Sequence, residues 1–241
     1  MNADLSSLER YGDNLTNLAH QNMFSPLIGY EVYVAYIFQI LLRKTRGKYN
    51  PLLLDSDEQR RFQIIAEAVR RMAVGDAPDP LPRWQVVALN YEALFAPFSV
   101  SSGDTFPVLP QSQEALQPES QARSAPEYEL DRRLLSRSFL EQRCSAQIAF
   151  SRLQAFFLAA RQTERKVVFF IDHFHRLLGG EPQHYPINAV NFLVPMLARR
   201  EIQFIGACTL AQHRQYSERD AAILCRLEEV YIKPDGEFGQ A

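Results

Sequence analysis

The run Val167-Val-Phe-Phe-Ile-Asp172 constrains the fold more than any other stretch of the sequence. Its apolar residues are β-branched or aromatic, with charged residues before them and an acid after them. This pattern is typical of a strand buried on both faces of a parallel sheet. Asp172 is then expected where the strand ends, which is where open α/β sheets bind their ligands.

Further apolar segments alternate with amphipathic ones along the chain. This alternation favours a doubly wound parallel sheet with helices on both faces, a three-layer α/β fold. The first strand of the sheet is expected at Leu52–Leu54, and Leu5–Gln21 is predicted to be a short amphipathic segment interrupted around Gly12. Later strands are predicted at Trp84–Asn90, Gln203–Thr209 and Glu229–Lys233, and helices at Glu31–Lys44, Phe62–Met72, Glu127–Ala160 and Asn188–Arg200.

Composition excludes several classes of protein. A net charge of −2 over 241 residues gives no electrostatic reason to expect binding to nucleic acid or to an anionic membrane, and no membrane insertion is expected. Neither a membrane span nor a signal peptide is evident, so a cytoplasmic protein is expected. Cys144, Cys208 and Cys225 are too widely spaced to suggest a disulfide framework or a zinc ribbon.

Residues 97–126 lose all periodicity and are rich in Ser, Pro, Gln and Glu. Such a long irregular segment is unusual inside a compact domain, so it is predicted to be an insertion. The amphipathic helix that follows could fold onto a partner protein or pack on its own domain, and the sequence leaves both open. Its candidate partner-binding residues are Leu130, Leu134, Leu135 and Phe139.

Short motifs occur in a recognisable order on both sides of Asp172. They include Tyr11-Gly-Asp-Asn-Leu-Thr16, Pro26-Leu-Ile-Gly29, Phe170-Ile-Asp172 and Gly206-Ala-Cys-Thr209. Through them the chain resembles the first ATPase module of the Clp-type AAA+ unfoldases, which are ring-forming ATPases that thread proteins through a central pore. The resemblance covers nearly everything except residues 97–143.

The resemblance implies a P-loop NTPase-like large subdomain of the AAA+ type, without the family's small helical lid domain. It also suggests how the chain is divided. The expected parts are an N-terminal helical segment at 1–25, an AAA+-like core at 26–96 and 144–234, an insertion with an amphipathic helix at 97–143, and a tail at 235–241.

The phosphate-binding loop departs from the family pattern. Where the family has Gly-x-x-Gly-x-Gly-Lys-Thr, this chain has Asp55-Ser-Asp-Glu58-Gln-Arg60-Arg61-Phe62. The glycines that let backbone amides wrap around phosphates are replaced. Arg61 keeps a positive charge at the lysine position, but Phe62 replaces the hydroxyl that would bind magnesium. Asp55, Asp57 and Glu58 would also face a polyphosphate with like charge. Triphosphate binding in the family's manner is therefore not expected.

The other site positions implied by the resemblance are kept only in part. Asp172 is followed by His173, where the family has the glutamate that activates water. Thr209 resembles the sensor threonine. Of the paired arginines that reach a neighbouring subunit's nucleotide, Cys225 stands at the first position and Arg226 at the second.

These substitutions predict a catalytically inactive Clp-like pseudo-ATPase that is not an enzyme, needs no cofactor, and acts as a protein-binding scaffold or regulatory subunit. Its partners would be an active Clp-type ATPase, a client, or a component of a protein-secretion machine. The alternative is an unorthodox ATP/ADP-binding switch or weak ATPase that uses Arg61, Asp172, His173 and Thr209. A metal-binding domain, with His173 and His175 joined by His184 or Cys208, is a third hypothesis, and no metal is expected under the first.

Overall fold

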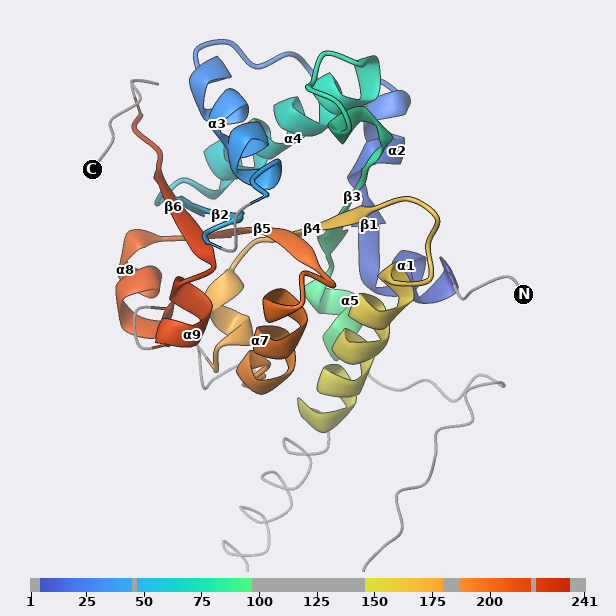
Figure 1. The fold of residues 1–241 in the computed structure, drawn as a ribbon, viewed down its shortest axis with the longest axis vertical. Helices are drawn as coiled ribbons and strands as arrows, with labels where there is room; N and C mark the ends of the chain where they lie inside the picture. The colour runs from blue at the N-terminus through green and yellow to red at the C-terminus, as the bar shows by residue number, and fades with distance from the viewer. Residues whose placement is uncertain (1–4, 45–46, 97–145, 180–186, 218–219, 235–241) are drawn as a thin grey trace, which may run out of the picture.

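The computed structural model describes residues 5–44, 47–96, 146–179, 187–217 and 220–234. Six strands form one sheet in the order β1-β3-β4-β5-β2-β6, and helices cover both of its faces (Figure 1). The expected three-layer, mostly parallel α/β fold is confirmed. The strands are β1 Gly12–Asn14, β2 Asn50–Leu54, β3 Gln85–Leu89, β4 Val167–Ile171, β5 Gln203–Cys208 and β6 Leu227–Tyr231.

Strand β4 lies inside the sheet between β3 and β5, and all five of its residues are buried. Its side chains alternate between the two faces. Val167, Phe169 and Ile171 enter one hydrophobic core, whereas Val168 and Phe170 enter the other. A strand buried on both faces needs apolar residues at every position, which explains the uninterrupted apolar run in the sequence.

One face of the sheet is covered by α2 (Leu15–His20), α3 (Glu31–Leu41) and α4 (Glu58–Val74) (Figure 1). The helix at residues 146–160 and several shorter elements cover the other face. Among the described residues there is no helical domain beyond these two layers, and no helix is long and apolar enough to cross a membrane. The remaining elements are α1 Leu5–Tyr11, α5 Tyr91–Phe95, α7 Val190–Ala198, α8 Leu210–Gln212, α9 Ala221–Leu224, the 3-10 helices Leu81–Arg83 and Phe174–Leu177, and the π-helix His213–Ser217.

Strand β1 corrects the expectation that Leu52–Leu54 contains the first strand. It interrupts the predicted Leu5–Gln21 segment and pairs antiparallel with β3, so that the sheet has one antiparallel edge strand. At Gly12 an added Cβ would lie 2.6 Å from the ring of Phe156 and 2.9 Å from the Ala88 carbonyl oxygen. Only glycine fits this close approach. Three residues are too few to show strand periodicity, so this strand could not be predicted from its sequence.

Helix α4 follows β2 after a short loop, as the sequence predicts. The Asp57 side chain caps its N-terminus by accepting a hydrogen bond from the Arg60 amide. Gly75, at φ 82°, ends it in the left-handed conformation that glycine adopts without strain. The helix is therefore fixed at both ends by local sequence, and its first turn lies beside the end of β4.

Candidate functional site

The strands β2, β4 and β5 are parallel and end together. Leu54 pairs with Cys208 in register, and Ile171 pairs with Gly206. We call the side of the sheet where these strands end its carboxyl end, and the side where they begin its amino end. The loop between β2 and α4 therefore lies beside Asp172, as the position of a phosphate-binding loop requires.

Carboxylates of the chain itself bind the backbone amides of this loop. Asp55 Oδ1 accepts a hydrogen bond of 3.0 Å from the Asp57 amide, and Asp57 Oδ1 accepts one of 3.1 Å from the Arg60 amide. Amides at such a helix N-terminus are the groups that bind phosphates in P-loop proteins. In this chain two of them already have an anionic partner.

Arg60 bridges the same two carboxylates. Its Nη1 lies 2.8 Å from Asp55 Oδ2, and its Nη2 lies 3.1 Å from Asp57 Oδ2. The Asp55 side chain is only 4% exposed, whereas that of Arg60 is 20% exposed. The carboxylates that the sequence suggested would repel a polyphosphate are therefore occupied in holding an arginine.

Arg61 is buried, with only 1% of its surface exposed. Its Nη2 and Nε donate to Asp172 Oδ1 at 3.0 and 3.2 Å, and its Nη1 donates to the Asp55 carbonyl oxygen at 2.6 Å. The charge at the lysine position thus ties α4 to the ends of β2 and β4. We call Asp55, Asp57, Arg60, Arg61 and Asp172 the inner ion-pair network.

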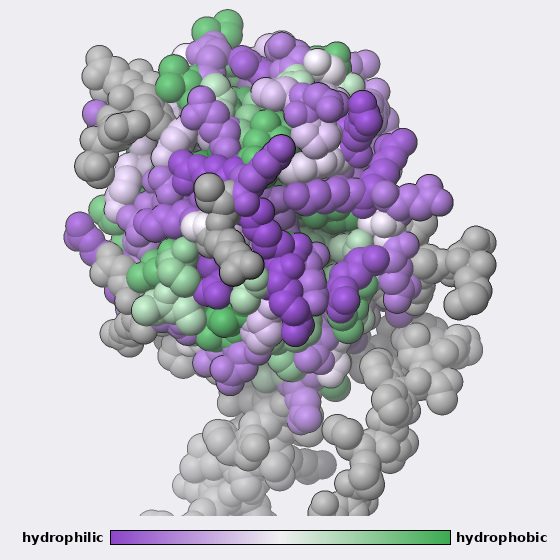
Figure 2. Space-filling model, viewed as in Figure 1, coloured by the Kyte–Doolittle hydropathy of each residue, from purple (hydrophilic) through white to green (hydrophobic). Residues whose placement is uncertain are grey.

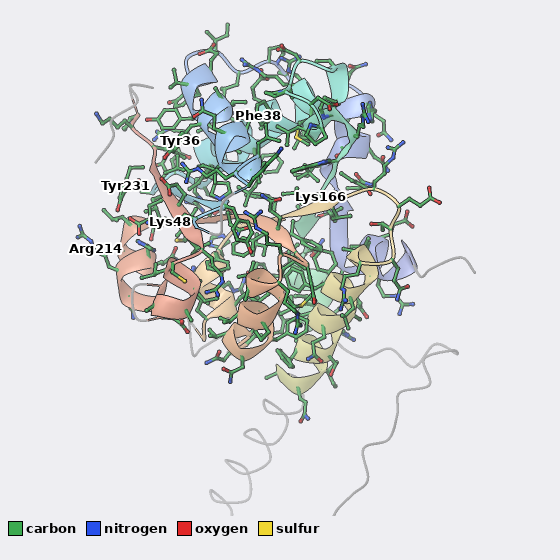
Figure 3. All side chains as sticks on the ribbon, viewed as in Figure 1. Tyr36, Phe38, Lys48, Lys166, Arg214 and Tyr231 are labelled. Carbon is green, nitrogen blue, oxygen red and sulfur yellow. The ribbon has the colours of Figure 1, made fainter. Side chains whose placement is uncertain are left out.

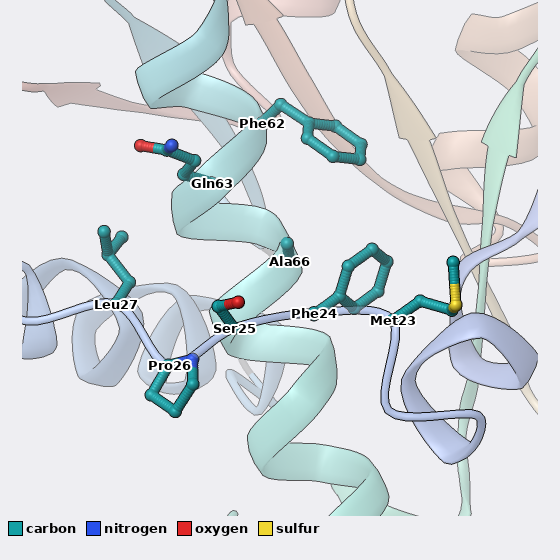
Figure 4. A pocket seen from close by; sticks show the side chains of 8 residues that line it. All are labelled: Met23, Phe24, Ser25, Pro26, Leu27, Phe62, Gln63 and Ala66. Carbon is teal, nitrogen blue, oxygen red and sulfur yellow. The ribbon is translucent and has the colours of Figure 1, made fainter.

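Phe62 does not join this network. Its ring packs edge-on against Phe24, with 6.2 Å between ring centroids, and lies 6.4 Å from the ring of Phe170. Figure 4 shows Phe24 and Phe62 beside α4, where they line a pocket of about 260 Å³. The position that the family fills with a hydroxyl therefore belongs here to an apolar surface. We call this hollow the Phe62 pocket, and it is lined by Met23, Phe24, Ser25, Pro26, Leu27, Phe62, Gln63 and Ala66.

His173 follows β4 in the left-handed conformation, at φ 48° and ψ 41°. Its Nε2 lies 3.5 Å from Glu58 Oε1 on α4. Glu58, Asp172 and His173 bring one possible metal-ligand atom each within 4.8 Å of one another. The structure thus groups a set of possible metal ligands different from the one that the sequence suggested.

The proposed set of His173 and His175 with Cys208 does not assemble. His175 is fully buried with its ring centroid 6.0 Å from that of His173. Burial raises the pKa of the Cys208 thiol to about 12, so the thiolate that a metal binds is disfavoured. His184, the remaining candidate, lies outside the described residues.

Two other predicted site residues have structural roles and take no part in the hydrogen bonds or ion pairs of the network. The Thr209 hydroxyl accepts a hydrogen bond of 3.2 Å from the Gln212 amide, in a capping box that starts α8. Arg226 donates to the Ala222 carbonyl oxygen and precedes β6, at the amino end of the sheet. The candidate partner-binding residues Leu130, Leu134, Leu135 and Phe139 lie outside the described residues.

The pairing inside the loop was not predicted from the sequence. Asp55 and Asp57 were expected to repel a ligand and not to pair with Arg60. Asp57 was the signal that could have revealed it. Aspartate is a common N-capping residue, and Asp57 stands just before a strong helical pattern and three residues before Arg60. That spacing favours a local ion pair on the first turn of a helix.

Comparison with known proteins confirms the resemblance. No protein-family model matches the sequence. The chain is 30% identical over 227 residues to Chaperone protein ClpB 1 of Thermosynechococcus vestitus, covering 94% of this chain and 21% of that protein. It is 29% identical over 232 residues to the chaperone ClpB of Tropheryma whipplei, covering 96% of this chain and 26% of that protein. The chain thus spans about a fifth to a quarter of these relatives.

Solved structures agree on the fold. A closed-state cryo-EM reconstruction of Hsp104 with ATPγS and FITC casein superposes with a TM-score of 0.65 at 21% identity, covering 94% of this chain and 31% of that chain. A Saccharomyces cerevisiae Hsp104–ADP complex gives a TM-score of 0.64 at 21% identity, covering 93% of this chain and 30% of that chain. Both share the fold of this chain.

These relatives correct one prediction. The altered loop predicts a protein that is not an enzyme. The relatives are ClpB chaperones, and the structural neighbours are Hsp104 complexes with ATPγS or ADP. They come from a family of ATPases, so the prediction is wrong on this comparison. Altered loop residues were not sufficient grounds for it.

Proposed function

We propose that this chain, whose sequence and fold are those of a Clp-type AAA+ module, acts as a protein-binding scaffold or regulatory subunit of a cytoplasmic protein assembly. Its partner would be an active Clp-type ATPase, a client protein, or a component of a protein-secretion machine. The inner ion-pair network carries the proposal. Through it, the chain's own side chains make the contacts that a phosphate would make in the family.

The network acts as an internal substitute for a ligand. Asp55 and Asp57 bind loop amides, while Arg61 joins α4 to Asp172 on β4. A nucleotide would have to break these contacts before its phosphates could reach the amides. A module held together in this way can present protein-binding surfaces in a fixed arrangement.

An apolar surface beside α4 supports protein binding. Met23 and Phe62 both line the Phe62 pocket, and they are 66% and 38% exposed. Exposed apolar groups gathered in one region often mark protein-binding surfaces. The amphipathic helix of the insertion remains a second proposed surface, through Leu130, Leu134, Leu135 and Phe139.

The test is to add the purified chain to a purified Clp-type ATPase and measure both binding and the rate of ATP hydrolysis. We expect a complex and a changed rate. Replacing Leu134 and Phe139 by Gln should weaken the complex, whereas replacing Val108 and Leu109 by Gln should not. The second pair is a matched control because it removes apolar side chains from the same insertion outside the amphipathic helix.

Two results would contradict the proposal. One is the absence of both binding and any rate change with a Clp-type ATPase and with secretion-machine components. The other is that both double variants weaken binding equally, which would show that general apolar stickiness and not the amphipathic helix drives association.

A second candidate function is a nucleotide-dependent switch. The observation that favours it is the exposure of Arg60, which at 20% could swing into solvent and release Asp55 and Asp57. Calorimetric titration with ATP and ADP in the presence of magnesium tests it. Saturable binding that is tighter in an Arg60→Gly variant would favour the switch over the scaffold. The absence of heat for both the wild-type protein and the variant at millimolar nucleotide would exclude the switch.

A further inference from the structure

Three possible metal ligands meet at the margin of the inner ion-pair network. Glu58 begins α4, whereas Asp172 and His173 directly follow β4. We call these three residues the outer cluster. Figure 3 shows Lys166, which immediately precedes β4, so the outer cluster lies at the other end of that strand.

The loop around the outer cluster carries more negative than positive charge. Four carboxylates lie there, and Arg60 and Arg61 pair with three of them. Four negative charges against two positive charges leave an excess of two negative charges when His173 is neutral. Glu58 is the carboxylate that neither arginine binds, and within the described residues its ion-pair partner is His173. Such an excess raises the local concentration of cations.

Asp172 offers one oxygen to a further ligand. Its Oδ1 accepts hydrogen bonds from Arg61 and, at 2.8 Å, from the His173 amide. No hydrogen bond from the described part of the chain reaches its Oδ2. Bonds to one oxygen orient the carboxylate, as they do for carboxylates that bind metals. The charge of Arg61 weakens the attraction of Asp172 for a cation, so most of that attraction has to come from Glu58.

The spacing of the outer cluster suits a small metal ion. A tetrahedral zinc ion with bonds of about 2.0–2.2 Å holds its ligand atoms about 3.4 Å apart. His173 Nε2 lies 3.5 Å from Glu58 Oε1, and one possible ligand atom from each of the three residues lies within 4.8 Å of the other two. The Glu58 side chain is 66% exposed, so it can rotate to shorten the longer separations.

The imidazole distinguishes this cluster from other exposed charged groups. Hydrophilic side chains cross the middle of the face that Figure 2 shows, so exposed acids alone do not indicate a metal site. Carboxylates by themselves suit magnesium or calcium, whereas an imidazole beside them favours zinc and related transition metals. In the described ranges this is the one group of three such ligands.

We propose that the outer cluster binds one divalent transition-metal ion of the zinc type through Glu58, Asp172 and His173, with water completing the coordination. Three protein ligands and one water are a common arrangement for zinc. The ion would join the first turn of α4 to the end of β4. The site departs from the expectation that the scaffold binds no metal, and it is independent of the proposed function because it needs no partner protein.

Calorimetric titration of the full chain, prepared without a polyhistidine tag, with zinc chloride at pH 7 tests the proposal. We expect one saturable site that His173→Asn and Glu58→Gln each weaken at least about tenfold. Asparagine is chosen because it tolerates the left-handed backbone at residue 173, where φ is 48°. The matched controls are His20→Asn, an exposed histidine, and Glu92→Gln, an exposed acid in the first turn of α5.

Thermal unfolding gives an independent readout. Zinc should raise the unfolding temperature of the wild-type protein and of both controls, but much less that of His173→Asn, because a ligand stabilises only the protein that binds it. The same measurement without zinc shows whether each variant is folded. Magnesium at the same concentration should stabilise the wild-type protein less than zinc does.

A further variant separates the outer cluster from thiols. Cys225 is an exposed free cysteine, and zinc also binds thiolates. Cys225→Ser should bind zinc as the wild-type protein does, and cobalt at the site should give no thiolate-to-cobalt charge-transfer band. The proposal is overturned if zinc does not bind, if His173→Asn and His20→Asn behave alike, or if Cys225→Ser alone abolishes binding.

Discussion

The two ends of the parallel strands treat their charges in opposite ways. At the carboxyl end, Arg60 and Arg61 face four carboxylates and are bound by three of them. At the amino end, Arg43, Lys166 and Arg200 line a smaller pocket, and Arg43 pairs there with Glu228. Removing one partner of an ion pair inside a fold leaves a buried charge uncompensated, so the charges at the carboxyl end depend on one another.

This contrast explains why the position expected to bind an anion has few free donors. In P-loop proteins the carboxyl end is where backbone amides and a lysine hold phosphates. In this chain Asp55 and Asp57 bind amides there, and Asp172 holds Arg61. The comparison can be tested by breaking pairs at one end and by changing Lys166 at the other.

The largest expected effect is on the buried pair. Asp172→Ala leaves the guanidinium of Arg61, which is 1% exposed, without its carboxylate. We expect the free energy of unfolding to fall by about 3 kcal/mol, because removing one partner leaves a buried charge uncompensated. Urea unfolding measures this loss. Adding Arg61→Met to the variant should restore part of the stability; a double variant less stable than Asp172→Ala would contradict this account.

A smaller effect is expected at Glu67, in the middle of α4. Burial opposes its ionisation, but hydrogen bonds from Arg70 and Arg71 outweigh burial and lower the pKa of Glu67 to about 2. Because the pKa is depressed in the folded protein, this stabilisation is full above about pH 4.5 and is lost as the pH falls toward 2. Glu67→Gln should cost about 2 kcal/mol at pH 7. Chemical denaturation at pH 7 and at pH 3 checks the prediction, and the two proteins should differ less at pH 3.

Lys166 should show the opposite pH dependence. Loss of hydration lowers its pKa to about 8, so between pH 8 and its ordinary value the unfolded chain binds more protons and stability rises with pH. Solvent screens this exposed residue, so we expect a gain of only about 1 kcal/mol. The measurement is denaturation in anion-poor buffer from pH 7.5 to 10, compared with Lys166→Met. If the stability of the wild-type protein and that of Lys166→Met changed with pH in the same way, the contrast between the two ends of the sheet would be contradicted.

The smallest effect is expected where an ion pair is exposed. Arg83 and Asp79 lie 3.3 Å apart, with side chains 79% and 74% exposed. Arg83→Ala should change the free energy of unfolding by less than about 0.5 kcal/mol, because water screens such pairs. Urea unfolding measures this change, and the loss measured for Asp172→Ala is the value with which it is compared. A loss as large as that of the buried pair would show that burial is not what distinguishes them.

The sequence by itself determined the sheet and the positions of its main strands. The run Val167–Ile171 favours a strand covered on both faces, because it is short, apolar at every position and made of β-branched and aromatic residues. Short motifs around it identified the Clp-type AAA+ module, and the comparisons agree. Local signals such as Asp57 and Gly75 also fixed the ends of α4.

Only the tertiary structure decided how the charged residues pair. Arg61 and Asp172 are 111 positions apart, and their contact depends on the parallel alignment of β2, β5 and β4. Likewise, Arg43, Lys166 and Arg200 come from three distant segments that meet only where the strands begin. Periodicity reports which side chains are buried. It does not report which charges meet, because Coulomb interactions depend on distances that the packed sheet alone sets.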